Sequence, residues 1–145
     1  VVLIDCPPSL GLLTLNALVA AEEILIPIQC EYYALEGLGQ LIRTVEMVTQ
    51  HLNPGLRISA ILLTMTDSRT RLSDQVADDV RGFFGDLVLN TAIPRSVRLS
   101  EAPGYGRSGL AYDTNAPGSQ AYRAAAQELV ARTIDLRSTT QQVQA

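Results

Sequence analysis

Runs of apolar residues alternate with segments of helical pattern along most of the chain, the first of them apolar on nearly all sides and the later ones amphipathic. The apolar runs have few polar interruptions, so each predicts a strand that is buried on both faces of a sheet. The expected strands are residues 1–4, 24–28, 57–65 and 87–93. The segments between and after them predict helices, which we expect at about residues 9–21, 35–51, 74–84 and 118–136. This alternation predicts an α/β fold, a three-layer doubly wound parallel sheet with right-handed crossovers.

Hydroxyl side chains indicate where two of the helices begin. Ser9 is expected to cap the first helix and Ser73 the third. The third helix should turn a set of apolar side chains inward, namely Leu72, Val76, Val80, Phe83 and Phe84, and the final helix should include Thr133 on its inner face. A short helix is expected at 95–101, with a loop at 102–106 and irregular structure at 111–117.

The length of 145 residues and the absence of a linker or repeat predict one domain, from residue 1 to 136. Residues 137–145 are polar, and we expect a frayed or disordered tail there. No apolar run is long enough to predict a membrane span. The chain starts inside an apparent core strand without an initiator Met, so we interpret it as the C-terminal part of a longer, N-terminally truncated protein.

Charge and residue usage narrow the possible functions. The net charge of −4 argues against a chain that coats nucleic acid over its whole surface. All eleven basic residues are arginine, so the 145 residues contain no lysine. A phosphate-binding P-loop requires a lysine on the phosphates, and this chain cannot supply one. The two cysteines, Cys6 and Cys30, have neither disulfide nor metal-site spacing, and reduced thiols are expected.

Asp5 directly follows the first apolar run and precedes Pro7 and Pro8. Ligands of parallel α/β sheets bind at the carboxyl ends of the strands, where a carboxylate can hold Mg²⁺ directly or through water. The two prolines fix the backbone as the chain leaves the strand. A strand-end aspartate that only caps the following helix is the alternative.

Arg95, Arg98 and Arg107 form a basic cluster in an otherwise acidic chain, with Glu101 as the one acid between them. The planar guanidinium fork suits bidentate contacts with phosphate. The alternatives are a solvated loop with a salt bridge to Glu101, and Arg95 turned inward toward a bound nucleotide.

Four blocks of the sequence resemble the ParA/Soj family of chromosome and plasmid partitioning ATPases. They are residues 5–8, 31–37, 63–70 and 93–103, and the resemblance extends over about residues 1–132. It implies a P-loop NTPase-like fold of the ParA–MinD type from which the deviant Walker A loop is missing. It also implies ATP and Mg²⁺ as cofactors of the full-length protein.

The resemblance assigns roles to single residues. Asp5 matches the catalytic, Walker-B-like aspartate that organises Mg²⁺, and Asp5, Cys6, Pro7 and Pro8 together match the switch II turn. The residues that match the nucleotide-binding segments are Thr64, Met65, Pro94, Arg95 and Ser96. Those that match the DNA-binding region are Arg98, Arg95 and Arg107. For Met65 and Pro94, plain core packing and a strand stop are the alternatives.

The resemblance therefore implies an ATPase that segregates DNA. An ATP-dependent homodimer would bind DNA non-specifically, a ParB-type partner would stimulate hydrolysis, and the protein would be cytoplasmic and nucleoid-associated, with no membrane contact. The chain alone is expected to be inactive. A related ATPase that positions a non-DNA cargo and an isolated interaction module are the alternatives. A MinD-like membrane helix and the cluster cysteines of nitrogenase iron proteins are both missing from the sequence.

Overall fold

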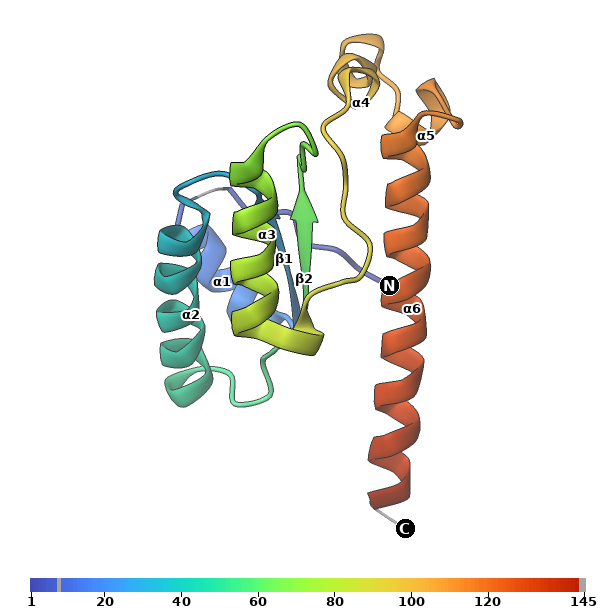
Figure 1. The fold of residues 1–145 in the computed structure, drawn as a ribbon. Coiled ribbons are helices and arrows are strands. Elements are labelled where there is room, and N and C mark those ends of the chain that lie inside the picture. The colour runs from blue at the N-terminus through green and yellow to red at the C-terminus, as the bar shows by residue number, and fades with distance from the viewer. Residues whose placement is uncertain (8, 144–145) are drawn as a thin grey trace.

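The computed structural model describes the backbone of residues 1–7 and 9–143 and the side chains of this range up to Arg132 (Figure 1). The two strands are β1 (Glu23–Gln29) and β2 (Arg57–Thr64). The longer helices are α1 (Leu12–Ala20), α2 (Ala34–His51), α3 (Arg71–Phe84) and α6 (Pro117–Val143). The short ones are η1 (Gly85–Leu87), α4 (Val97–Glu101), η2 (Ala102–Tyr105) and α5 (Gly109–Tyr112).

The sheet is parallel, and its strands are joined by a helical crossover. β1 pairs with β2 from Glu23–Arg57 to Gln29–Thr64, with an irregularity between Ile24 and Leu25. Pro27 lies in β1, which is an edge strand in the described part of the chain because only β2 pairs with it. Proline, which lacks a backbone N–H, is tolerated in strands at such an edge. Residues 88–94 run beside the other edge of β2.

Alternate residues of the strands face two separate cores, which defines three layers (Figure 1). On one face the side chains of Ile26, Ile28, Ile61 and Leu63 pack against α2 and α3. On the other face Ala60 and Leu62 pack with Ala125 of α6. A third cluster joins α1 to α2 through Leu18, Val45 and Val48. The predicted α/β class with helices on both faces of a parallel sheet is confirmed.

The strand predicted at residues 1–4 does not form. Val1, Val2 and Leu3 are almost fully exposed, and the segment has no ladder partner among the described residues. Apolar composition alone does not make a strand, because the backbone N–H and C=O groups also need a neighbouring strand. The run therefore has the composition of a buried strand without its pairing.

Two predicted helix caps are also wrong. Thr70, not Ser73, caps α3 by accepting a hydrogen bond from the Ser73 N–H at 3.4 Å, and Ser73 is buried inside the first turn. The cap position of α1 is Gly11, which makes no side-chain bond, while the Ser9 carbonyl accepts a hydrogen bond from the Thr14 hydroxyl at 2.6 Å.

The apolar face of α3 is narrower than predicted. Val76, Ala77 and Val80 are buried, whereas the side chains of Leu72 and Phe83 are 46% and 79% exposed. With α3 beginning at Arg71, the buried stripe runs through Ser73, Val76 and Val80, and Leu72 and Phe83 lie outside it.

The segment predicted as a fourth strand, 87–93, is extended but not a regular strand. Leu89 N–H donates to the Ile61 carbonyl and Ile93 N–H to the Leu63 carbonyl, each at 2.8 Å. Between them, the N–H groups of Asn90 and Thr91 donate to the carboxylate of Glu128 on α6, at 2.8 and 3.0 Å. This side-chain acceptor replaces part of the ladder.

Toward the C-terminus, the short helix predicted at 95–101 is observed as α4, while 111–117 is partly helical because α5 ends at Tyr112. The backbone of α6 continues to Val143. The side chains of Thr133 and of the predicted tail, 137–145, lie outside the described residues, and the tail stays a prediction. No helix in the described part combines the length and apolar character that crossing a membrane requires.

Candidate functional site

Three chain segments converge where the parallel strands end. Beyond β2, the Thr66 N–H donates to the Ile93 carbonyl and the Arg95 N–H donates to the Thr66 carbonyl, both at 3.0 Å. The Cys30 N–H, just after β1, donates to the Thr64 carbonyl at 3.2 Å. The two predicted nucleotide-binding segments, 64–65 and 94–96, therefore lie next to each other although they are distant in sequence.

The end of β2 combines an anchored residue with a strained one. Thr64 is buried, and its hydroxyl donates to the Ile28 carbonyl at 3.1 Å, which fixes the strand end. Met65 follows with a φ of +53°, the only non-glycine residue with positive φ among those described, and its side chain is 41% exposed. A left-handed conformation is unfavourable for a residue with a Cβ, and such strain concentrates at binding sites.

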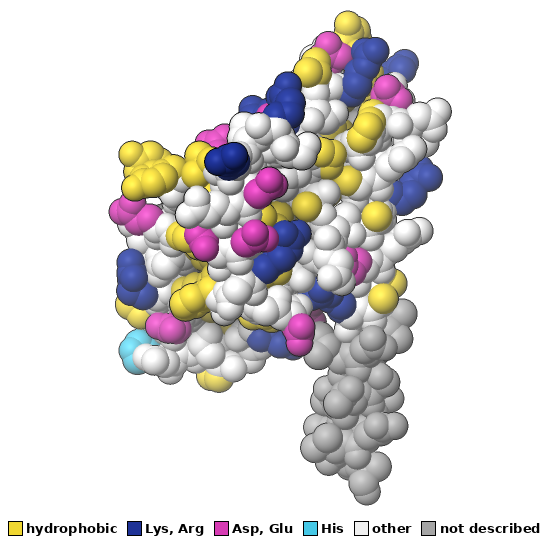
Figure 2. Space-filling view, viewed as in Figure 1, with side chains coloured by type: hydrophobic (Ala, Val, Ile, Leu, Met, Phe, Trp, Pro, Cys, Tyr) yellow, Lys and Arg dark blue, Asp and Glu magenta, His cyan; other side chains and the backbone are white. Residues whose placement is uncertain are grey.

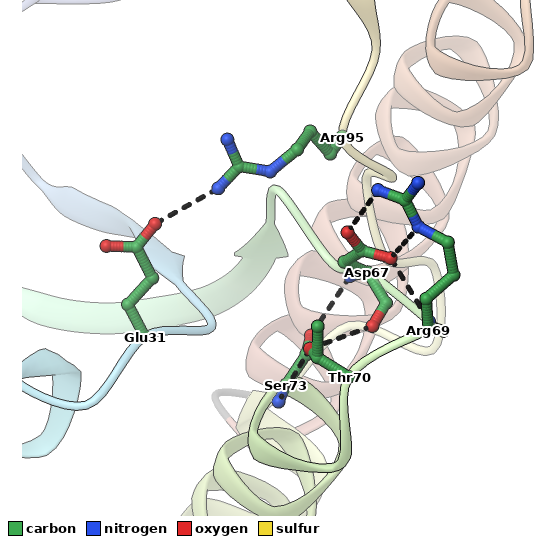
Figure 3. Close-up of polar contacts among 6 residues, drawn as sticks. All are labelled: Glu31, Asp67, Arg69, Thr70, Ser73 and Arg95. Atoms are coloured by element: carbon green, nitrogen blue, oxygen red, sulfur yellow. Dashed lines mark hydrogen bonds and ion pairs between the residues drawn. The ribbon is translucent and has the colours of Figure 1, made fainter.

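Arg95 extends across this edge toward the loop after β1 (Figure 3). Its guanidinium lies 3.1 Å from the Glu31 carboxylate, and both side chains are more than half exposed. Arg95 therefore pairs with Glu31, and the salt bridge to Glu101 that the solvated-loop alternative expected is formed by Arg98. An exposed pair of this kind contributes at most about 1 kcal/mol to stability, so Arg95 can change partners at little cost.

A second pair, Asp67 with Arg69, lies beside it and was not found by the sequence reasoning (Figure 3). Asp67 accepts bonds from Arg69 Nε at 2.8 Å and from a terminal guanidinium nitrogen at 2.7 Å. These side-chain bonds, with one from the Arg69 N–H, hold the pKa of Asp67 well below its usual range. The Asp67 N–H also donates to the Ser73 hydroxyl at 3.0 Å, which ties the Asp67 backbone to the first turn of α3. The spacing of aspartate and arginine two residues apart, just before a helix cap, was the available signal.

Ser96 is the N-cap of α4, where its hydroxyl accepts from the Leu99 N–H at 3.5 Å. Arg98, in the first turn of the same helix, lies 3.3 Å from a Glu101 carboxylate oxygen and 3.7 Å from an Asp113 carboxylate oxygen. Bonds with Tyr112 and the nearby charge of Glu101 raise the pKa of Arg98. Arg107 is exposed and has no ion pair with the residues that the structure describes. Of the three predicted DNA-binding arginines, Arg95 and Arg98 form ion pairs, whereas Arg107 has none with the described residues.

The switch residues are not brought to this edge by any polar contact. Asp5 and Cys6 are exposed, and Asp5 forms no hydrogen bond or ion pair with the described residues. The Cys6 thiol makes only a weak contact with the Ile4 carbonyl, at 3.8 Å, and Pro8 lies outside the described residues. Among the described side chains, no group of three or more His, Cys, Asp or Glu could hold a metal ion. At this edge the carboxylates of Glu31 and Asp67 are each paired with an arginine.

The fold and the position of the site define a class, the P-loop ATPase type of α/β protein with its site at the carboxyl ends of parallel strands. Two solved structures of cobyrinic acid a,c-diamide synthase from Mycobacterium smegmatis share the fold. The one with bound ATP analog and magnesium superposes with a TM-score of 0.66 at 40% identity, over 83% of this chain and 43% of that one. The one with bound ADP and magnesium gives 0.63 at 40% identity, over 83% and 42%.

Sequence comparison identifies the family within this class. Residues 1–58 match a family model described as an AAA domain. The chromosome partitioning protein ParA of Caulobacter vibrioides is 55% identical over 134 residues, 92% of this chain and 50% of that protein. The sporulation initiation inhibitor protein Soj of Bacillus subtilis is 54% identical over 130 residues, 90% and 51%. Over about nine-tenths of its length the chain is a ParA/Soj-type sequence, and the predicted resemblance is confirmed. It spans about half the length of these relatives.

Proposed function

We propose that this chain is the part of a ParA-type ATPase that carries its base pocket, its switch and its DNA-binding face. The full-length protein would use ATP to segregate DNA. The observation that carries the proposal is the pairing of 64–66 with 93–95 at the carboxyl end of the sheet. It joins two sequence blocks that the ParA/Soj resemblance matches to the nucleotide-binding segments.

The base end of the nucleotide would lie between Met65 and Pro94. Flat apolar contacts and backbone groups suit a purine ring, and the strained, exposed Met65 is held in place by the buried Thr64. ATP with Mg²⁺ would supply the phosphoryl group that is transferred to water. Asp5 would hold the metal or its water through its carboxylate. Since the 145 residues contain no lysine, the phosphate-binding lysines must come from elsewhere in the protein, and we expect this chain alone to show no turnover.

The DNA-binding face would be the surface of α4 and the turn that follows it. Arg107 is available without rearrangement, whereas Arg98 has to exchange Glu101 and Asp113 for phosphate. Because Arg98 is 59% exposed, these ion pairs are weak enough for such an exchange. Binding of this kind is insensitive to sequence and falls steeply with salt. An ATP-dependent homodimer, a ParB-type partner and a cytoplasmic, nucleoid-associated location belong to the same proposal.

The test is a charge reversal in the full-length protein, Arg98→Glu, with Arg43→Glu as the matched control. Arg43 is an exposed arginine of α2 that has no ion pair with the described residues. With ATP and Mg²⁺ in low salt, Arg98→Glu should weaken binding to duplex DNA and lower the slope of log affinity against log salt by about one. Arg43→Glu should leave both nearly unchanged. Intact binding by Arg98→Glu would remove this face from the proposal.

Association through apolar surface is a second candidate, which the exposed N-terminal residues favour. Leu12 and Leu13 of α1 are 78% and 72% exposed, and residues 1–3 are exposed as well. Surfaces of this kind mark interaction sites. Light scattering on the 145-residue chain should then show oligomers, and a monodisperse monomer would dismiss this candidate.

A further inference from the structure

We propose that Tyr105, stacked on Tyr112 beside Arg98 and Arg107, is a platform on which an unpaired nucleobase stacks. The inference rests on the proposed DNA binding and deepens it. It assigns the α4–α5 surface a contact with bases in addition to contacts with phosphate, and hence a preference for DNA with unpaired bases.

The two tyrosine rings form a flat stack at the surface. Their centroids lie 5.1 Å apart and their planes differ by 26°. The Tyr105 side chain is 68% exposed although one ring face lies against Tyr112. The opposite ring face is therefore open to solvent. An exposed aromatic face, already supported from behind, can accept a base without first being ordered.

The support behind the platform is held by hydrogen bonds. The Tyr112 hydroxyl donates to the Glu101 carboxylate at 3.3 Å. Burial of the hydroxyl and the nearby Glu101 charge raise the pKa of Tyr112. Ser108 caps the short helix that carries Tyr112 by accepting from the Ala111 N–H at 3.2 Å. Tyr112 is thus fixed in position, and through the stack it orients Tyr105.

The charges around the platform favour a nucleic acid over another partner. Gly106, in the left-handed conformation with φ of +62°, turns the chain directly after Tyr105, and the exposed Arg107 follows. Arg98 interacts with the Tyr112 hydroxyl and with the Glu101 carboxylate. Figure 2 shows basic, acidic and hydrophobic side chains interleaved over the end of the molecule that carries α4 and α5, and the two acids there, Glu101 and Asp113, both pair with Arg98. Arginines beside an exposed ring are the pattern by which proteins hold single-stranded nucleic acid, with bases on the rings and phosphates on the guanidinium groups.

The experiment uses the full-length protein with ATP and Mg²⁺ and two probes, a labelled single-stranded DNA oligonucleotide and the duplex of the same sequence. Tyr105→Ala removes the ring, and Tyr105→Phe keeps it. Phe83→Ala is a control for loss of an exposed aromatic elsewhere, because Phe83 is 79% exposed at the far end of α3. Affinity is measured by fluorescence anisotropy at two salt concentrations.

We expect Tyr105→Ala to weaken single-stranded binding by at least about fivefold, the lower end of the effect of one base stack, with little change for the duplex. Tyr105→Phe and Phe83→Ala should bind as the unchanged protein does. Because stacking involves no ion release, the salt slope of Tyr105→Ala should also be unchanged.

Two results would overturn the inference while leaving DNA binding in place: no loss with Tyr105→Ala, or an equal loss on both probes. If the unchanged protein bound neither probe, the proposed DNA-binding function and the platform would both be refuted.

Discussion

Gly118 tests how α4, the proposed DNA-binding helix, is fixed to the rest of the fold. A Cβ placed on Gly118 would lie 2.5 Å from Cδ1 of Leu99 and 3.0 Å from Cβ of Ser96. A Cβ on Gly109 would meet the other methyl group of Leu99. Leu99, next to Arg98 on α4, is therefore enclosed between two glycines and cannot move away from one without approaching the other.

The expected magnitude of Gly118→Ala follows from this geometry. Relief of the contact requires a shift of about 1 Å, and overpacking of this kind typically costs about 1–3 kcal/mol. Alanine also loses less backbone entropy than glycine when the helix forms, and this stabilises the folded state by up to about 1 kcal/mol. The net expectation is a free energy of unfolding lower by about 0.5–2 kcal/mol.

Gly82→Ala is the matched control, since Gly82 lies in α3 and a Cβ there would meet nothing within 4 Å. It should raise the free energy of unfolding by about 0.5–1 kcal/mol. Both variants are compared by urea denaturation. Adding Leu99→Ala to Gly118→Ala should cost less than the sum of the single changes, with a coupling of about 0.5–2 kcal/mol. If Gly118→Ala were as stabilising as Gly82→Ala, or if the two changes were additive, the enclosed position of Leu99 would be wrong.

Three further predictions concern stability. Burial alone would raise the pKa of Glu128, but the N–H groups of Asn90 and Thr91 and the Arg132 guanidinium outweigh it and lower the pKa to about 2. Because the folded-state pKa lies below the ordinary value of 4.5, the stabilisation by the ionised Glu128 carboxylate is complete above that pH and is lost as the pH falls toward 2. In thermal scans against pH, Glu128→Gln should flatten that loss of stability. An unchanged profile would refute this role of Glu128. Thr70→Ala should lower the free energy of unfolding by about 0.5–2 kcal/mol through loss of the α3 cap, and a neutral result in urea denaturation would exclude the cap. Glu31→Gln should change it by less than about 1 kcal/mol, because the pair with Arg95 is exposed, and a larger loss would show a structural role.

The elements that the sequence predicted best are those with a strong, uninterrupted pattern. β1, β2 and α2 begin and end within one or two residues of their expected bounds because their apolar periodicity is continuous. Residues 1–4 carry the same kind of signal, but a strand also depends on a neighbour that the run itself does not encode. Thr70 and Ser73 are three residues apart, and either hydroxyl could have capped α3.

The part of the candidate site that lies at the ends of the strands could be predicted from the sequence. The resemblance to the ParA/Soj family assigned the segments at 64–65 and 94–96 to one pocket, and the structure places them side by side. The partner of Arg95 was not predictable, since Glu31 is 64 positions away and their distance depends on the whole sheet. The pair of Arg98 with Glu101, three positions away, was among the sequence alternatives. Likewise, the Glu128 carboxylate that interrupts the fourth strand lies 38 positions from Asn90.

The most direct test of the central claim is the dependence of DNA binding on nucleotide in the full-length protein. Binding to a non-specific duplex is measured in low salt with Mg²⁺ and ATP, with Mg²⁺ and ADP, and with Mg²⁺ alone. The account predicts strong binding with ATP only, lost on addition of salt and weakened by Arg98→Glu. Binding that is equal under all three conditions would contradict an ATP-timed partitioning protein.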